Sequence, residues 1–519
     1  MLDRREWILV SLSGVLLSLA LPPLPFAPLA WLGLVPLLMV LENQEPRRAA
    51  LIGWFMGFIH NFGAFHWMAF HVTMPRWLAI VACLLTCVSL AFFTAAVAAG
   101  VRYSARWLGR YWAWALLPFW VGAEYLRTFT EFAMPWNVLG YTQVRFLGLI
   151  QQADIWGVFG VSAWLVGLNI VAYHAVKAGR TGWRPALNHG ALFILAITVV
   201  ATYGRWRLNE LPIRPTNIRI ALVQPNVGME EKWSPEKGLQ HTETVLEQQT
   251  LKIRRGSVDL VMWPETAIPS YMVYGLSHRD SVRPRRVVSP RYRALMRRVT
   301  AHIGVPLVTG TPIYDYATKY AYNSAAVISP RSLSVQSYDK RVLVPFGERV
   351  PYQAVFGFLE NLNLGMANWR AGDRATVFET PAGKFSAAVC FESAFPDLMR
   401  RFVRDGADFL VILTNDAWFA NTSLIYQHAE YASFRAIENR VWIARDANTG
   451  ISCLIDPWGR QVQKAGAFEQ KTIVGSIGKR ESDTLYLHLG DWLAQLCLLA
   501  GVVLLAGGWV KSRRQSTQA

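Results

Sequence analysis

Long stretches without charge fill most of the first 210 residues, and one more lies near the end of the chain. A helix needs about 20 apolar residues to cross the hydrocarbon core of a bilayer. On this length the pattern predicts eight transmembrane helices, two of them within residues 7–41, where the Pro-rich "LPPLPFAP" makes a hairpin. The other six are expected at residues 51–74, 77–101, 111–123, 158–176, 185–204 and 492–510.

The pattern changes between the seventh and eighth of these segments. Short runs rich in β-branched residues, such as "IRIALVQPN", "VDLVMWPE", "VPLVTGTPI", "KFSAAVCFE" and "ADFLVILTND", alternate with helical stretches such as "SPRYRALMRRVTAHIG" and "AFPDLMRRFVRDG". Strands that alternate with helices predict an α/β domain. We therefore expect a seven-helix transmembrane domain at 1–210, an α/β domain at 215–485, the eighth transmembrane helix at 488–511 and a tail at 512–519.

The net charge of +17 is concentrated beside the apolar segments. Basic residues that flank membrane spans mark the cytoplasmic side. With eight helices the two termini fall on that side, and the α/β domain falls on the opposite side. A nucleic-acid-binding protein would need a basic face on a soluble module, and we expect none here. The flanking residues are Arg4, Arg5, Arg47, Arg48, Arg102, Arg106, Arg110, Lys177, Arg180, Arg184, Lys511, Arg513 and Arg514.

Composition agrees with a membrane protein. Charged residues make up 17% of the chain, against about 25% in an average soluble domain. Of the five cysteines, only Cys390 and Cys453 lie outside the apolar segments, so neither a disulfide framework nor a zinc pattern is predicted. The ten histidines also lack the spacing of metal ligands.

Three apolar runs of the α/β domain lie next to polar residues of different kinds. "LVMWPE" ends in Glu265, "FSAAVCFE" contains Cys390, and "YDKRVLVPFGE" places Lys340 before an apolar run and Glu348 after it. In α/β folds the residues just past the carboxyl ends of strands line the ligand-binding crevice. A buried, inert thiol is the commoner fate of a lone cysteine in such a run. The three motifs together favour a reactive site.

Cys390 needs a base or a positive charge nearby to react as a thiolate at neutral pH. No histidine follows it closely in the sequence, so a papain-like Cys–His pair has little support. The alternative is that Glu265 takes the thiol proton while Lys340 stabilises the thiolate and the tetrahedral oxyanion. The backbone N–H of Phe391 would complete the oxyanion hole.

The motifs "WPE", "YDKRVLVPFGERVP", "CFE" and "TNDAWF" resemble those of the nitrilase (carbon–nitrogen hydrolase) superfamily and its Glu–Lys–Cys triad. Together with eight predicted transmembrane helices, they make the chain similar to the apolipoprotein N-acyltransferase family. The resemblance covers essentially the whole chain. It implies an α-β-β-α sandwich for the α/β domain, with Glu265 as base, Lys340 as oxyanion stabiliser and Cys390 as nucleophile.

The same resemblance assigns further roles. Glu348, Glu392 and Phe391 would support the triad, the two carboxylates by positioning Lys340 or the attacking amine. Substrates would be bound by residues of mobile loops, namely Trp233, Asn415, Trp418 and Phe419; for the aromatic residues the alternative is ordinary interfacial packing. Two positions depart from the family pattern: Phe391 replaces a Tyr found in some members, and Ala420 follows "DAWF" where Gly is expected, which would stiffen that loop.

In that family the cysteine takes an acyl chain from a membrane phospholipid as a thioester and passes it to the α-amino group of a lipoprotein's S-diacylglyceryl cysteine. The resemblance implies phosphatidylethanolamine as the donor, no metal or cofactor, a monomer, and a multi-pass location in the bacterial inner membrane. The catalytic domain would face the periplasm.

Two other functions remain open at this stage. The triad would equally suit a membrane-tethered amidase or nitrilase that acts on a small amide. A transporter or lipoprotein receptor with an inactive domain is a third possibility, although the complete set of Glu265, Lys340 and Cys390 argues against it.

Overall fold

The computed structural model describes residues 3–210, 218–234, 238–276, 285–353, 355–356 and 368–518. The chain forms two compact units. The first comprises residues 1–129, 134–211 and 488–519, and the second comprises residues 130–133 and 212–487. The predicted boundary at residue 215 lies outside the described residues.

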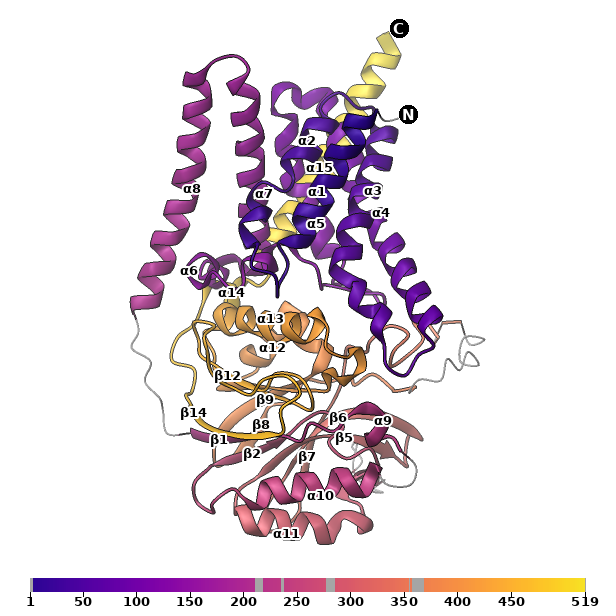
Figure 1. The fold of residues 1–519 in the computed structure, drawn as a ribbon, viewed down its shortest axis with the longest axis vertical. Coiled ribbons are helices and arrows are strands. Elements are labelled where there is room, and N and C mark those ends of the chain that lie inside the picture. Colours follow the sequence, from indigo (N-terminus) through magenta and orange to yellow (C-terminus); the bar gives the residue numbers. More distant parts are fainter. Residues whose placement is uncertain are drawn as a thin grey trace. The chain divides into compact units, whose positions relative to one another are not determined.

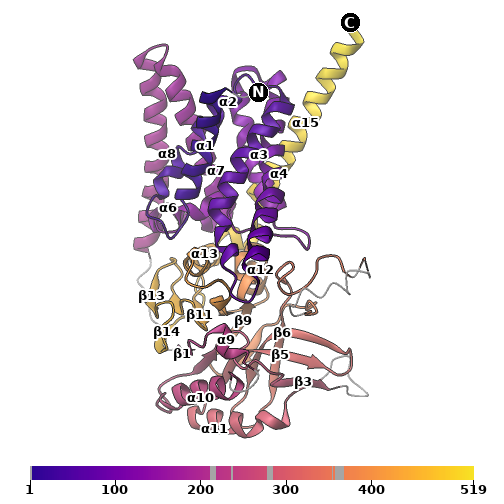
Figure 2. The same cartoon turned by 45° about the vertical axis from the view of Figure 1, so that its right-hand side comes forward.

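The first unit is helical, and its long helices run alongside one another (Figures 1 and 2). Its α-helices are α1 (Arg4–Leu19), α2 (Val35–Leu41), α3 (Pro46–Phe65), α4 (Arg76–Leu108), α5 (Leu116–Leu126), α6 (Leu147–Ile150), α7 (Ala153–Gly179), α8 (Trp183–Glu210) and α15 (Trp492–Gln518). Its short 3-10 helices are η1 (Ala27–Trp31), η2 (His66–Phe70), η3 (Gly109–Ala115) and η4 (Leu139–Gln143).

Among the described residues, four helical stretches are long and apolar enough to cross a membrane. They are Arg76–Leu126, Ala153–Gly179, Trp183–Asn209 and Trp492–Lys511. The fourth and fifth predicted spans fall together in the first of these, and the sixth, seventh and eighth correspond to the other three. The count of eight stays a prediction. Helix α15 continues to Gln518, so the segment expected as a tail is helical where it is described.

The second unit contains two sheets. The eight-stranded sheet has the order β14-β1-β2-β5-β3-β4, with β6 paired to β5 and β7 paired to β6, and the six-stranded sheet has the order β13-β12-β11-β10-β9-β8. The strands of the first are β1 (Ile218–Gln224), β2 (Leu260–Trp263), β3 (Val273–Leu276), β4 (Arg285–Val288), β5 (Leu307–Asp315), β6 (Tyr320–Ile328), β7 (Val335–Asp339) and β14 (Lys471–Ile477). Those of the second are β8 (Phe378–Thr380), β9 (Gly383–Val389), β10 (Phe409–Thr414), β11 (Ile443–Ala447), β12 (Cys453–Ile455) and β13 (Gln461–Lys464).

The two sheets pack face to face, with contacts between β1 and β11 and between β6 and β9. Helices cover the outer faces, as Figure 1 shows. The first sheet carries α10 (Gly238–Leu251) and α11 (Arg293–Ile303), and the second carries α12 (Pro396–Arg404) and α13 (Ser423–Asn439). The α-β-β-α sandwich implied by the resemblance is therefore confirmed. The described part of the unit also contains the short elements α9 (Met229–Lys232), η5 (Pro290–Tyr292), η7 (Cys390–Ala394) and η8 (Asp416–Phe419). Helix α14 (Leu485–Leu489) spans its carboxyl end.

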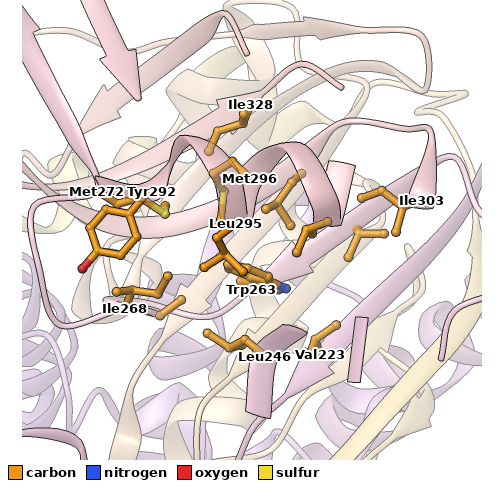
Figure 3. Close-up of a cluster of buried hydrophobic side chains, with 14 of the residues drawn as sticks. Val223, Leu246, Trp263, Ile268, Met272, Tyr292, Leu295, Met296, Ile303 and Ile328 are labelled. Atoms are coloured by element: carbon orange, nitrogen blue, oxygen red, sulfur yellow. The ribbon is translucent and has the colours of Figure 1, made fainter. Parts of the chain in front are cut away.

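Helix α11 shows why the helices lie on the sheets. Its apolar side chains recur at helical spacing, and Leu295, Met296 and Val299 are buried against β1, β2 and α10 (Figure 3). The indole of Trp263 lies fully buried in the same cluster, and its N–H donates to the Thr250 hydroxyl at 2.9 Å. This anchor fixes the end of β2, and Glu265 follows two residues later in a buried turn.

Parallel pairing brings the carboxyl ends of several strands to one side of each sheet. In the first sheet β1, β2 and β5 are parallel, and in the second β9, β10 and β11 are parallel. Strand β7 pairs antiparallel with β6, which is antiparallel to β5, so β7 runs in the direction of β5 and β2. The residues after β2, β7, β9 and β10 are those in which the sequence motifs fall.

Candidate active site

Glu265 lies in a turn directly after β2 that neighbouring β5 holds tightly. Gly310 of β5 donates its N–H to the carbonyl of Pro264 at 3.1 Å and accepts from Ala267 N–H at 2.9 Å. The approach is so close that a Cβ on Gly310 would lie 2.4 Å from the Glu265 Cα. Thr266 adopts φ +44° to complete the turn. The backbone of the proposed base is therefore fixed by the sheet rather than by a free loop.

The Glu265 carboxylate is almost fully buried and accepts two good hydrogen bonds. The Asn323 side-chain amide donates to Oε1 at 2.7 Å, and the backbone N–H of Asn415 donates to Oε2 at 2.9 Å. The Nζ of Lys340 lies 3.7 Å from Oε1. The carboxylate thus has partners from β6 and from the segments after β7 and β10.

Lys340 follows β7 and is fully buried between two carboxylates. Its Nζ lies 2.8 Å from Glu348 Oε2 and 2.9 Å from Glu348 Oε1. Glu348 also accepts from the backbone N–H of Val344 at 2.9 Å and from Asn323 at 2.9 Å. Among the described residues, Glu348 is therefore the charged partner closest to Lys340, and its supporting role stays a prediction.

Cys390 is half-buried at the point where β9 ends and η7 begins. Its φ is +53°, a conformation that non-glycine residues rarely adopt. Backbone strain of this kind costs of the order of 1–3 kcal/mol and persists where the surrounding structure enforces it. A residue forced to turn at a strand end presents its side chain away from the sheet, which suits a nucleophile.

Burial and neighbouring charges determine the protonation of these groups. Burial raises the pKa of the Cys390 thiol, the Glu265 carboxylate raises it further, and Lys340 opposes both. Burial likewise raises the pKa of Glu265, against the attraction of Lys340. For Lys340, burial alone would lower the pKa, but Glu348, Glu265 and Cys390 outweigh it and raise the value. At neutral pH the site therefore holds a neutral thiol beside a permanently charged ammonium.

Glu392 joins the segments that carry Cys390 and Lys340. Its Oε1 accepts from the Tyr338 hydroxyl at 2.7 Å and from the backbone N–H of Arg341 at 2.7 Å, and its Oε2 accepts from Val389 N–H at 2.8 Å. The carboxylate is fully buried. Phe391, next to it, is also buried and its ring packs edge-on against Phe395.

The four residues expected to bind substrates differ in their surroundings. Asn415 is buried, and its side chain contacts Met229 and Asn448 while its backbone binds Glu265. Trp233 follows α9 and is half-exposed. Trp418 and Phe419 lie in η8 and are both partly buried. Their roles toward substrates stay predictions.

Ala420 directly follows η8 with φ +49° and ψ −159°. This is a region that only glycine adopts without strain. Glycine was expected at this position, and the backbone there has a conformation that suits glycine although the residue is alanine.

Asn323 is a residue of this site that the sequence reasoning missed. Its Nδ2 donates to both Glu265 Oε1 and Glu348 Oε1, and so connects the two carboxylates that flank Lys340. Its backbone carbonyl also accepts from Lys340 N–H at 2.8 Å. A buried asparagine within β6 was the available signal, because an amide in a strand interior needs polar partners.

His428 is the second missed residue. The sequence separation argued against a histidine near Cys390, yet α13 brings the His428 ring to it: Nε2 lies 3.1 Å from the Cys390 carbonyl oxygen and 3.0 Å from Ser393 Oγ. The other ring nitrogen lies 2.8 Å from Asp416 Oδ1, and Asp416 Oδ2 accepts from Arg445 at 2.8 Å. This buried chain supports the strained turn at Cys390.

Cys390, Asp416 and His428 also place three atoms of metal-ligand type within 4.8 Å of one another. A metal there would have to displace Arg445 from Asp416, and this ion pair is fully buried. The arrangement thus suits hydrogen bonding to the Cys390 backbone better than coordination, and we assign it no metal.

Comparisons with known proteins assign the α/β unit to a family. Residues 219–482 match the family model described as carbon–nitrogen hydrolase. A nitrilase-superfamily member from Saccharomyces cerevisiae, Nit3, covers 52% of this chain and 93% of its own chain at 19% identity, with a TM-score of 0.37. The family model alone spans about half of the chain, which places the α/β unit among the carbon–nitrogen hydrolases.

Matches that include the first unit identify the family of the whole chain more narrowly. Residues 13–171 match the model described as apolipoprotein N-acyltransferase N-terminal domain. The apolipoprotein N-acyltransferase of Geobacter metallireducens is 34% identical over 97% of this chain and 95% of its own length, and that of Chlorobaculum tepidum is 31% identical over 96% of both. The chain belongs to the apolipoprotein N-acyltransferase family.

Proposed function

We propose that the chain N-acylates the N-terminal S-diacylglyceryl cysteine of lipoproteins with an acyl chain taken from a membrane phospholipid. Membership of the family makes the chain an acyltransferase that acts on lipoproteins. The observation that carries the mechanism is the cluster of Glu265, Lys340 and the half-buried Cys390, in which a neutral thiol lies beside a carboxylate and an ammonium. Phosphatidylethanolamine is the proposed donor.

In the first half-reaction the Cys390 sulfur attacks the ester carbonyl of the phospholipid. The thiol proton passes to Glu265, and negative charge on the tetrahedral oxygen is stabilised by Lys340 and the N–H of Phe391. The carbon–oxygen bond then breaks, Glu265 returns the proton to the departing alkoxide, and a lysophospholipid leaves. The acyl chain stays on Cys390 as a thioester.

In the second half-reaction the neutral α-amino group of the lipoprotein cysteine attacks the thioester carbonyl. Glu265 takes a proton from the amine nitrogen, the carbon–sulfur bond breaks, and the proton returns to the Cys390 sulfur. The products are an amide and the free thiol, so the enzyme is restored. Two sequential substrates with a covalent intermediate predict ping-pong kinetics.

Glu348 and Asn323 have a defined part in both steps. They hold Lys340 at a fixed distance from Glu265, so the positive charge is in place before the oxyanion forms. Preorganised charge of this kind needs no rearrangement during the reaction. Trp233, Trp418 and Phe419 are proposed to surround the acyl chain and exclude water from the thioester.

The proposed location is the bacterial inner membrane, as a multi-pass monomer with the catalytic unit on the periplasmic side. The four candidate spans and the basic residues beside the apolar segments support this orientation.

A transfer assay tests the function. The full chain in detergent micelles with phosphatidylethanolamine and a diacylglyceryl-cysteine peptide should give an N-acylated peptide, detected as a mass increase of one acyl chain. Omitting the phospholipid, or using Cys390→Ala, should abolish the product. Hydrolysis of small amides with no acylated peptide would instead support a membrane-tethered amidase.

A further inference from the structure

Lys232 is a buried lysine beside the active site that the mechanism does not use. It ends the short helix α9, and only 1% of its surface is exposed. Lysine is almost never buried without a paired charge. In the described part of the chain, the carboxylate that acts on its charge is that of Glu265, yet its Nζ contacts Glu265 at the backbone carbonyl. An ammonium in such a place needs a reason other than packing.

Among the described residues, the polar contacts of Lys232 Nζ lie on the turn that carries Glu265. Nζ is 3.5 Å from the backbone carbonyl oxygen of Glu265 and 3.3 Å from the hydroxyl of Thr266. Thr266 has the positive φ that completes this turn. Lys232 therefore contacts the same turn that Gly310 holds through its hydrogen bond to Pro264.

We propose that Lys232 is a positioning residue for Glu265. The Lys232 ammonium holds the turn after β2 and stabilises the ionised form of the Glu265 carboxylate. This inference rests on the proposed role of Glu265 as the base. The site would then contain two cations with separate tasks. Lys340 faces the reacting atoms, whereas Lys232 acts only through Glu265.

The protonation of Lys232 makes the proposal pH-dependent. Burial lowers its pKa to about 7, and the Glu265 carboxylate opposes this. Titratable groups face Glu265 from each neighbouring segment. Lys340 and Glu348 come from the segment after β7, Lys232 comes from α9, and Cys390 follows β9. Since the pKa of Lys340 is raised, Lys232 is the cation of this set that loses its charge near neutral pH. Its support of Glu265 is present below about pH 7 and lost above it.

The test measures the rate at which iodoacetamide alkylates Cys390 in the full chain between pH 5.5 and 9, followed on the Cys390 peptide by mass spectrometry. Iodoacetamide replaces the lipid, so the result does not depend on the identity of the acyl donor. The variant is Lys232→Met, which keeps the length of the side chain and removes its charge. The matched control is Glu230→Gln, because Glu230 is an exposed charge on the same short helix.

The ratio of the Lys232→Met rate to the wild-type rate should be close to one at pH 9 and fall about tenfold below pH 6. A tenfold loss equals a shift of one pKa unit, at the lower end of what an opposite charge within about 4–6 Å produces. Lys232→Arg should match the wild-type rate below pH 6, because a guanidinium is charged throughout the range of the assay, and in a Glu265→Gln background Lys232→Met should have no further effect.

A ratio that is the same at every pH would overturn the proposal, because a purely structural role lowers the rate uniformly. The profile of each variant is normalised to its own rate at pH 9, so a reduced yield of folded protein does not change the outcome. An unchanged profile for Lys232→Met together with a defect in Glu265→Gln would reject the role of Lys232 while leaving the triad in place.

Discussion

At the Cys390 sulfur, burial and the Glu265 carboxylate both favour the protonated thiol. The thiolate is the form that reacts and that oxidants attack most readily. A neutral resting thiol is therefore protected until a substrate carbonyl is in place and Glu265 can accept the proton. Lys340 stays charged throughout, because Glu348 and Glu265 hold its proton.

Asp416 gives a prediction for stability at the same scale. Burial alone would raise its pKa, but Arg445 and His428 outweigh this and hold the value below its ordinary 3.8. A depressed pKa contributes stability that is present above about pH 4 and lost as the pH falls further. Asp416→Asn should destabilise the chain by about 3–5 kcal/mol, because it leaves a buried Arg445 unpaired, and should weaken the loss of stability in acid.

The predicted effect of Asp416→Asn is checked by the melting temperatures of the detergent-solubilised chain at pH 7 and below pH 4. Asp397→Asn is the control, since Asp397 pairs with Arg400 and Arg401 while 37% exposed and should matter by at most about 1 kcal/mol. Equal melting temperatures for Asp416→Asn and Asp397→Asn would contradict the structural role of Asp416.

Ala420 gives a prediction of the opposite sign. Its positive φ costs of the order of 1–3 kcal/mol, while glycine loses about 0.5–1 kcal/mol more conformational entropy on folding. Ala420→Gly should therefore stabilise the chain by about 1 kcal/mol, seen as a higher melting temperature. A lower one would show that the alanine fits its conformation without strain.

Four strand ends assemble the site at the scale of elements. The proximity of Glu265, Lys340 and Cys390 was predictable from the sequence because each lies next to a short apolar run. The residues that hold these three side chains in place were not predictable in the same way. Asn323 lies inside a strand, and His428 reaches Cys390 only because α13 packs beside η7. Such partners depend on tertiary packing, which strand and helix patterns do not encode.

The strands and helices of the α/β unit followed their patterns closely: "IRIALVQPN" contains β1, "ADFLVILTND" contains β10, and "AFPDLMRRFVRDG" contains α12. The burial of Lys232 could not be predicted from the sequence for a different reason. Its neighbours Glu230, Glu231 and Trp233 are exposed, so the polar sequence around it suggests a surface segment, and only the fold shows that its side chain is buried.

A substitution at Gly310 tests how strictly strand β5 fixes the position of Glu265, the proposed base. A Cβ there would lie 2.4 Å from the Glu265 Cα, so Gly310→Ala must displace the turn after β2. We expect at least a hundredfold loss of acyl transfer, since a shift of about 1 Å at a catalytic group costs that much. Gly190→Ala, in an open position on α8, is the control. Full activity of Gly310→Ala in the transfer assay would show that the position of Glu265 is not critical.

At the scale of the whole molecule, we expect the two units to divide the task between membrane attachment and chemistry. The helical unit contains the candidate spans, and the α/β unit contains every residue of the proposed site. A soluble α/β unit would rarely meet substrates that are anchored in a bilayer. The membrane unit is therefore expected to be required for turnover rather than for the chemistry of Cys390.

The predicted topology can be tested independently of activity. Reporter domains that are active only on one side of the membrane, fused to the amino terminus, to the carboxyl terminus and within the α/β unit, should place both termini in the cytoplasm and the α/β unit outside it. Termini on opposite sides would exclude an even number of spans.

The central claim is that Cys390 carries the acyl chain between two lipids. The most direct measurement is the mass of the intact protein after incubation with phosphatidylethanolamine and no acceptor. The wild type should gain the mass of one acyl chain, lose it when a diacylglyceryl-cysteine peptide is added, and show no gain as Cys390→Ala. An acylated Cys390→Ala protein, or a wild type that transfers the chain without ever carrying it, would contradict the account.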